Sequence, residues 1–147
     1  MTRYLVGVTF EPGVDDTPME DWKPEEIQSH LDYYTALNRE LKASGELVGG
    51  EVLTGPDLAM IVTSDGATAP VVTDGPFAEF KEWLAGYQII DVESVARAIQ
   101  IAALVSAAPG PNGVPLQQPI HLRRIMDEAP STAEEMNEYA ETARGER

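Results

Sequence analysis

Apolar and polar residues alternate at the start of the chain. Tyr4, Val6 and Val8 fall on one face of residues 3–10 if the segment is extended. A period of two residues is typical of a β-strand that is covered on one face. The Pro- and Asp-rich stretch 11–22 cannot continue this strand, so we expect a loop there.

A helical period follows this loop. Pro24 suits the first turn of a helix because its missing N–H is not needed there, and Glu25 and Glu26 favour the positive end of the helix dipole. Between residues 25 and 44 the apolar positions recur at helical spacing: Ile27, Leu31, Tyr34, Leu37 and Leu41. Gly45 can adopt the left-handed conformation that ends a helix, so the pattern predicts a helix up to Ser44.

Short runs of apolar and β-branched residues predict strands in the middle of the chain. We expect one strand over residues 46–53. Residues 58–63 and 69–73 flank the sequence Ser64-Asp65-Gly66, which is typical of a tight turn, and together they predict a β-hairpin. Pro70 cannot donate a hydrogen bond within a sheet, so the second arm is an edge strand or begins at this residue.

The last part of the chain repeats the same kinds of pattern. It predicts a strand over 84–92, a helix over 93–106, a Pro- and Gly-rich loop over 107–118 and a strand over 120–125. Ser131 and Glu134 have the spacing of a capping box, which predicts a short acidic helix at the C-terminus.

The order of these elements indicates the fold class. Two helices among neighbouring antiparallel strands cover one face of a sheet more easily than they enclose both faces. We therefore predict an α+β fold with a ferredoxin-like antiparallel sheet and two helices on one face. The second face of such a sheet needs a cover, which a symmetric partner can supply, so we expect a homodimer.

The composition excludes several classes of function. With 25 acidic and 10 basic residues the net charge is −15, and Arg123-Arg124 is the only adjacent basic pair. Direct nucleic-acid binding needs clustered positive charge, so we expect none, and we expect no adhesion to an anionic membrane. The chain has no run of about 20 apolar residues and no signal-like start, and we expect a cytoplasmic location.

The types of residue present also argue against bound metals and cofactors. Cysteine is absent, which excludes disulfides and thiolate metal sites. The two histidines are far apart in sequence, so a histidine-based zinc site is not expected. No phosphate-binding loop or dinucleotide-binding motif is present, and we predict neither a metal nor a cofactor.

The acidic residues are unevenly distributed. Residues 11–26 contain seven of them and residues 127–147 contain another seven. We interpret these stretches as a solvated loop and tail rather than a cation site. We expect one domain over 1–126 and an acidic C-terminal extension over 127–147, whose charges could pair with Arg123 and Arg124.

One stretch of the sequence is distinctive. Asp74-Gly75-Pro76-Phe77 has the residues of a sharp turn: Asp bonds to downstream N–H groups, Gly permits a positive φ, and Pro fixes its own φ. From the residues alone, we predict a turn between two strands, with Phe77 directed into the core.

The block around this turn resembles the YCII-related family, in the branch named for its Asp-Gly-Pro-Phe motif. The matching residues are Val72 to Phe77, Glu79, Lys81-Glu82, Gly86-Tyr87 and Ile89 to Asp91, with a similar closing loop and strand over 107–123. The resemblance covers roughly residues 3–126. It implies a dimeric α/β barrel, in which two ferredoxin-like sheets close against each other. The family is suspected of enzymatic activity because its members carry a helical His and an Asp, and the branch is associated with extracytoplasmic-function sigma factors.

His30 and Asp74 are the candidate catalytic residues. His30 borders the apolar stripe of the first helix, where the family places its His, and a neutral imidazole beside a carboxylate can act as a general base. Asp74 is the best match for the acid, and Asp91 and Asp32 are weaker candidates. The competing interpretations are a half-buried histidine bonded to a backbone carbonyl and an aspartate that only forms a turn.

Other residues near the motif have simpler interpretations. Lys81 and Glu82 could bind an anionic substrate, although a surface ion pair is the more common use. Aromatic side chains on strands usually belong to the core, but three could line a cleft between sheet and helix: Phe77, Trp83 and Tyr87. His121 alternates with apolar neighbours and is expected to point away from their face.

Two hypotheses about function remain open from the sequence. In the first, the protein is a cofactor-free enzyme that uses His30 and an Asp to move protons on a small organic substrate, in isomerase, lyase or dehalogenase chemistry. In the second, it is a regulatory or ligand-binding module that acts through protein contacts, with a sigma factor as a candidate partner. Its acidity would suit a basic partner surface.

Overall fold

The computed structural model describes residues 1–75 and 80–145 of the 147-residue chain. Its strands and helices follow one another as β1 (Thr2–Thr9), α1 (Pro24–Ala43), β2 (Leu47–Val52), β3 (Met60–Thr63), β4 (Val71–Asp74), β5 (Leu84–Val92), α2 (Val95–Ser106), β6 (Ile120–Arg124) and α3 (Ala133–Gly145). The strands and helices predicted from the sequence are therefore confirmed, with ends that differ by one or two residues.

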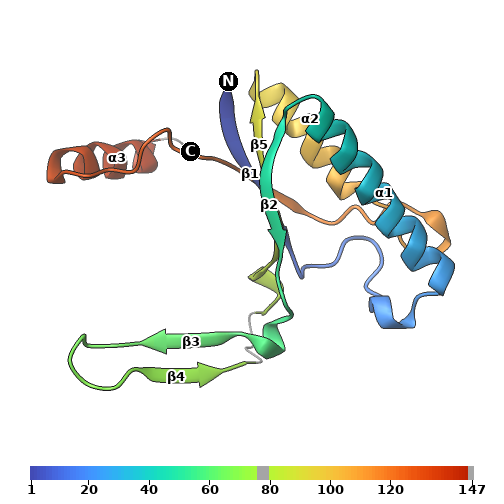
Figure 1. Ribbon diagram of the computed structural model, residues 1–147, viewed down its shortest axis with the longest axis horizontal. Helices are drawn as coiled ribbons and strands as arrows, with labels where there is room; N and C mark the ends of the chain where they lie inside the picture. The colour runs from blue at the N-terminus through green and yellow to red at the C-terminus, as the bar shows by residue number, and fades with distance from the viewer. Residues whose placement is uncertain (76–79, 146–147) are drawn as a thin grey trace.

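Four strands form one antiparallel sheet in the order β2-β5-β1-β6. Helices α1 and α2 lie side by side on one face of this sheet (Figure 1). The path β-α-β-β-α-β, with the first and third of these strands in the middle, is the ferredoxin-like arrangement. The predicted α+β fold, with two helices on one face, is confirmed.

The core lies between the sheet and the two helices. The two central strands supply Val6, Ile90 and Val92, which are almost completely buried. The helices supply the other buried side chains, among them Leu37, Leu41, Ala98, Ile101 and Val105. Complete burial of a side chain of this size contributes about 1.5–3 kcal/mol, so this layer stabilises the domain.

Local interactions set the ends of the two covering helices. At the start of α1 the Glu26 carboxylate accepts a hydrogen bond from the Lys23 N–H at 2.9 Å, and Gly45 follows the helix with a φ of 81°. The predicted left-handed residue after the first helix is thus confirmed. Helix α2 starts two residues later than predicted because the Ser94 hydroxyl accepts from the Arg97 N–H at 3.1 Å and so caps the helix.

The predicted hairpin is present, but it is not part of the main sheet. Strands β3 and β4 pair with each other as a separate two-stranded sheet, and β4 begins directly after Pro70. At the turn, the Asp65 carboxylate accepts from the N–H groups of Thr68 and Ala67, and these bonds lower the pKa of Asp65 to about 2. The hairpin extends away from the sheet on the side opposite the helices (Figure 1).

The C-terminal helix also extends away from the body of the domain (Figure 1). Its start was predicted one residue too early. The Thr132 hydroxyl accepts from the Glu135 N–H at 3.1 Å, and the Glu135 carboxylate accepts from the Ser131 N–H at 2.7 Å. Glu135, rather than Glu134, therefore completes the cap, because its side chain reaches back to the chain before the helix.

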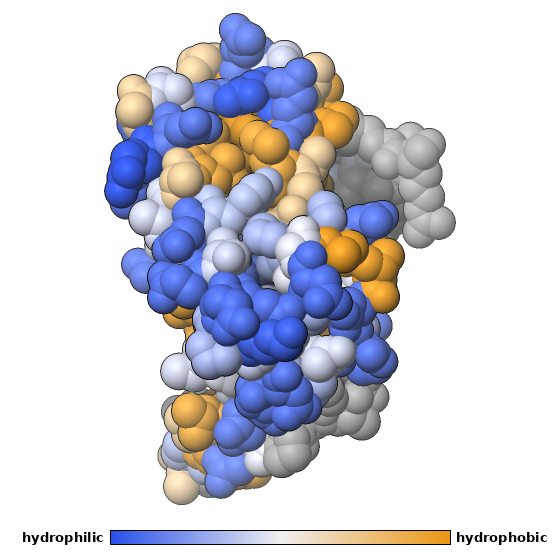
Figure 2. Space-filling view, turned by 90° about the vertical axis from the view of Figure 1, so that its right-hand side faces the viewer, coloured by the Kyte–Doolittle hydropathy of each residue, from blue (hydrophilic) through white to orange (hydrophobic). Residues whose placement is uncertain are grey.

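The helix-covered side of the molecule has a mixed surface. Figure 2 shows hydrophilic residues over most of its lower half and an apolar patch in its upper half. Exposed apolar side chains of α2 include Val95, Ile99 and Leu104. Among the described residues, no helix has the length and apolar character required to cross a membrane.

An ion pair joins the start of β2 to the first turn of α2, and we predict a pH-dependent contribution to stability from it. The Arg97 guanidinium contacts both carboxylate oxygens of Glu46, at 2.8 and 2.9 Å, and this contact lowers the pKa of Glu46. A lowered carboxyl pKa stabilises the fold above the unfolded-state value of about 4.3, and the effect is lost as pH falls through the folded-state value. Glu46→Gln should therefore reduce the free energy of unfolding by up to about 1 kcal/mol at pH 7 and by less at pH 3.

The matched control for this experiment is Glu51→Gln, which removes the same charge from an exposed position on β2. Urea unfolding monitored by circular dichroism at both pH values measures the effect. If the two variants lose the same free energy of unfolding at pH 7, the ion pair does not contribute to stability.

Candidate functional site

His30 lies in the first half of α1 and is half-buried. Its Nδ1 atom is 2.9 Å from the carbonyl oxygen of Pro109, in the loop that follows α2. A carbonyl oxygen only accepts hydrogen bonds, so Nδ1 must hold the proton of this contact. In the neutral ring the other nitrogen, Nε2, then has a free lone pair and can accept a proton.

Two aromatic rings fix the orientation of this imidazole. Trp22 and Tyr34 approach it edge-on, with ring centroids 5.5 and 5.0 Å from that of His30. Trp22 is itself buried, and its indole N–H donates to the carbonyl oxygen of Thr17 at 2.9 Å. The segment before α1, which was predicted only as a loop, thus supplies one wall of the histidine environment.

The same face of α1 is bonded to the end of α2. The Tyr33 and Tyr34 hydroxyls donate to the carbonyl oxygens of Leu104 and Val105, at 2.5 and 3.3 Å. The last carbonyls of a helix lack partners within that helix, so side chains of a neighbour can satisfy them. Burial raises the pKa of Tyr34 to about 12, which keeps its hydroxyl a donor. Together with the bond from His30 to Pro109, these contacts hold the two helices together.

The structure does not join Asp74 to His30 within one chain. Asp74 ends β4, directly opposite Met60, and is exposed. Among residues 1–75 and 80–145, no hydrogen bond or ion pair links the His30 ring to any carboxylate. The turn predicted after Asp74 and the core position predicted for Phe77 fall on residues 76–79, which lie outside the described residues.

The two weaker aspartate candidates lie in different surroundings. Asp32 is on the solvent side of α1, where it accepts a hydrogen bond from the Gln28 side chain at 2.8 Å. Asp91 is on β5, opposite Arg3 of β1, on the face of the sheet away from the helices. One oxygen of Asp91, Oδ1, is buried and has no hydrogen-bond partner among the described residues.

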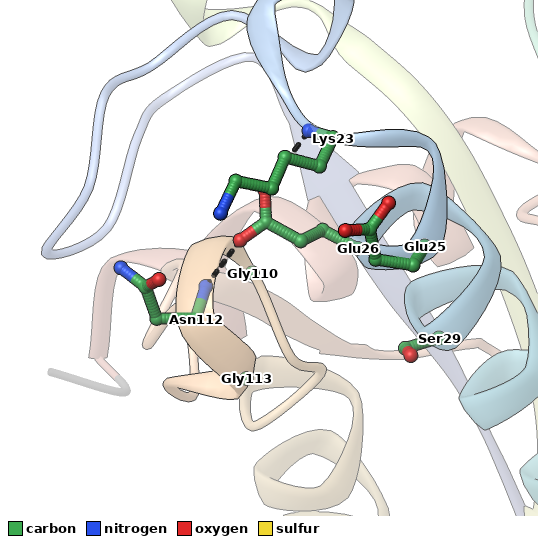
Figure 3. Close-up of a pocket in the computed structure, with 7 residues that line it drawn as sticks. All are labelled: Lys23, Glu25, Glu26, Ser29, Gly110, Asn112 and Gly113. Carbon is green, nitrogen blue, oxygen red and sulfur yellow. Dashed lines mark hydrogen bonds between the residues drawn. The ribbon is translucent and has the colours of Figure 1, made fainter.

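A small open cavity lies at the start of α1, and His30 is not among the residues that line it. Its volume is about 270 Å³, and it is lined by Lys23, Glu25, Glu26, Ser29, Gly110, Asn112 and Gly113 (Figure 3). Ser29 precedes His30 in sequence, and Gly110 follows the Pro109 carbonyl to which His30 is bonded. The cavity is slightly smaller than the usual range for a small-molecule site, which begins at about 300 Å³.

Glu26 closes one side of this cavity. Its carboxylate accepts hydrogen bonds from the backbone N–H groups of Asn112 and Lys23, and these bonds lower the pKa of Glu26 (Figure 3). Asn112 and Gly113 have positive φ values of 61° and 74°, so the loop turns back towards the helix at this point. We did not predict this cavity from the sequence, although the Pro-Asn-Gly turn was a signal for a fixed loop.

The remaining candidates are distributed over other surfaces. Lys81 and Glu82 are exposed, and no ion pair joins them in the described part of the chain. Alternation along β5 places Tyr87 on the face opposite the helices, so it does not line a cleft between sheet and helix. His121 is exposed, as predicted, while its neighbours Ile120 and Leu122 pack against the core.

Three further residues complete the comparison with the sequence predictions. Trp83 is half-buried, just before β5. Arg123 and Arg124 are exposed, and no ion pair joins them to the acidic side chains that the structure describes. Among residues 1–75 and 80–145, no group of three or more His, Asp or Glu is arranged to hold a metal ion.

Comparison with known proteins shows a family to which the chain is similar and a relative in another organism. The family profile of the YCII-related domain matches residues 2–110 of the chain, from β1 to the loop after α2. An uncharacterized protein of Rhizobium meliloti (strain 1021) is 32% identical over 94 residues, which are 64% of this chain and 75% of that protein. The matched part of the family profile includes both His30 and Asp74.

We predict that His30 contributes to stability through its bond to Pro109. His30→Phe keeps an aromatic ring between Trp22 and Tyr34 but removes the donor, which leaves a partly buried carbonyl without its partner. The variant should lose about 1–2 kcal/mol of unfolding free energy. Tyr33→Phe is the matched control because its hydroxyl bond is exposed to water, and it should lose less. Urea unfolding of both variants measures this, and a His30→Phe protein as stable as the unmodified protein would refute the prediction.

Proposed function

The chain belongs to the YCII-related family, and we propose that it is a cofactor-free enzyme in which His30 accepts a proton from a small organic substrate. The observation that supports this proposal is the hydrogen bond from Nδ1 of His30 to the Pro109 carbonyl. It fixes one tautomer and leaves Nε2 as the proton acceptor, which is how a general base must be oriented. The cavity at the start of α1, which is lined by the sequence neighbours Ser29 and Gly110, provides space for a small molecule.

The chemistry of such a site is proton transfer. An imidazole that removes a proton beside a carbonyl or a leaving group can support isomerisation, elimination or dehalogenation. We propose Asp74 as the second group of the reaction because its carboxylate is exposed and makes no hydrogen bond with the described residues. The placement of the chain in the Asp-Gly-Pro-Phe branch of the family is part of the same proposal.

We also propose that the protein is a homodimer that closes through the uncovered face of its sheet. The alternation that buries Val6 and Ile90 against the helices directs Leu5 and Ile89, which are half-buried, to this face, where Val48 is exposed. The unpartnered Oδ1 of Asp91 is on the same face. A symmetric second copy would cover these apolar side chains.

The enzyme proposal predicts that activity depends on the His30 ring but not on its neighbour Tyr33. Purified protein would be tested with small carbonyl, hydroxy and halogenated acids, with proton or halide release as the signal. Turnover by the unmodified protein should fall at least about 100-fold in His30→Phe, because the variant lacks the proton acceptor. Asp74→Asn tests the carboxylate separately.

The control for this experiment is Tyr33→Phe, which should keep the turnover of the unmodified protein. A folded His30→Phe variant with unchanged turnover would remove His30 from the reaction. Absence of turnover with every substrate class would count against the enzyme proposal as a whole.

A second candidate function is a regulatory module that contacts a basic partner, for which we propose an extracytoplasmic-function sigma factor. The net charge of −15 favours it. We predict that a purified sigma factor of this class from the same organism binds the protein, and that calorimetry shows weaker binding as salt rises from 50 to about 500 mM, because salt screens surface charges. An equally acidic, unrelated protein should not bind. Binding that is absent at low salt would exclude this partner.

A further inference from the structure

The hairpin of β3 and β4 has an uncovered apolar face. Residues directly opposite each other in an antiparallel pair lie on the same face, so Val62 and Val72 share a face with Met60 and with Asp74, which is opposite Met60. The three apolar side chains among them, which we call the hairpin face, are 60%, 51% and 65% exposed respectively. An isolated two-stranded sheet is only marginally stable in water, so this face is expected to have a cover.

Helix α3 has an uncovered apolar stripe. Met136, Tyr139 and Ala140 are three and four residues apart and so lie on one side of the helix. Met136 and Tyr139 are 49% and 44% exposed. Helical spacing places Glu138 on the opposite side. We call the first three residues the α3 stripe.

Both features lie on the same side of the sheet but at opposite ends. In Figure 1 the hairpin and α3 extend away from the helix-covered face, with α3 near the end of the sheet where β1 begins and the hairpin near the end where β2 finishes. Within one chain the length of the sheet separates them, and the uncovered face of the sheet lies between them.

We propose that the α3 stripe of one chain docks on the hairpin face of a second copy of the chain. This proposal rests on the homodimer proposed above and specifies which segments of the two chains meet. Each chain would then contribute one hairpin and one α3 to the contact, which gives two equivalent contacts related by the two-fold axis.

Two-fold symmetry allows two arrangements in which the sheets of the two chains face each other. A two-fold axis that runs between the sheets and perpendicular to their strands brings the α3 end of one chain over the hairpin end of the other. An axis parallel to the strands instead brings α3 against α3 and hairpin against hairpin. The two arrangements therefore differ in which segments are neighbours.

Charge favours the first arrangement. Helix α3 contains four acidic residues and one basic residue, so two copies of it would repel each other. Residues 58–73 contain a single charged residue, Asp65, which lies at the tip of the hairpin. Strand β4 also ends in Asp74, which lies opposite Met60 on the hairpin face. An acidic helix with an apolar stripe therefore meets less repulsion on a hairpin face with this one carboxylate than on a second helix with four.

The absence of cysteine from the sequence makes a direct test possible. One preparation would contain Val62→Cys in the hairpin face and the other Tyr139→Cys in the α3 stripe. After equilibration of the two preparations together, a short bis-maleimide should link one variant to the other more efficiently than it links either variant to itself. Because each chain has one cysteine, no link can form within a chain.

Matched control positions lie on the opposite sides of the same elements. Thr63→Cys is on the other face of the hairpin and Glu138→Cys is on the acidic side of α3, and the link between these two variants should be at least fivefold weaker. The double variant Met136→Glu/Tyr139→Glu should weaken dimerisation at least about tenfold in sedimentation equilibrium, whereas Glu138→Gln should not weaken it.

The outcomes of these experiments distinguish the docking of α3 on the hairpin from the proposed homodimer and from the proposed role of His30. Links of α3 to α3 and of hairpin to hairpin, or a dimer without any of these links, would overturn the docking of α3 on the hairpin while leaving the homodimer intact. A full-length chain that sediments as a monomer at micromolar concentration would overturn both. The role of His30 is tested by its own variants, so neither result decides it.

Discussion

The two central strands of the sheet place their large buried apolar side chains on one face, and the rest of the arrangement follows from this constraint. Val6 of β1 and Ile90 of β5 are on the face that α1 and α2 cover, and both are almost completely buried. Because successive side chains of a strand point to opposite faces, the same register directs Leu5 and Ile89 away from the helices. The chain builds a core on one side of the sheet and leaves apolar side chains on the other.

The position of His30 follows from how the two helices are held on that core. Three side chains of α1 donate hydrogen bonds to carbonyl groups at the end of α2 or just after it, and His30 is one of them. This contact gives the imidazole a structural role, which was one of the interpretations considered from the sequence. A structural role for Nδ1 does not prevent a chemical role for Nε2, because the bond that holds the ring also fixes its tautomer. The two interpretations concern different atoms of the same side chain.

Periodic features of the sequence were sufficient for the elements and the fold class. The alternation in β1 and the helical spacing in α1 each report which face is buried, and burial is what forms these elements. Other features depend on contacts between distant segments. The bond between His30 and Pro109 joins residues 79 positions apart, and nothing in the local sequence indicates it. The runs of apolar and β-branched residues in β3 and β4 predict strands but do not say whether these strands join the main sheet.

The sequence also did not show which of two glutamates caps the start of α3. Both Glu134 and Glu135 follow a hydroxyl residue at the spacing of a capping box, and only the path of the chain before α3 decides that Glu135 is used. The cavity at the start of α1 likewise depends on the positive φ values of Asn112 and Gly113, which bring that loop to Glu26.

The distribution of charge is consistent with association of this acidic chain with itself. At a net charge of −15, two copies repel each other unless the surfaces that meet are nearly free of charge. Residues 11–26 and 127–147 together hold 14 of the 25 acidic residues, whereas residues 58–73 hold only Asp65. The exposed apolar side chains of β3 and β4 are thus in a segment with little charge. Repulsion between surface charges is screened within about 10 Å at 0.1 M salt, so the charge on distant loops opposes contact through this segment only weakly.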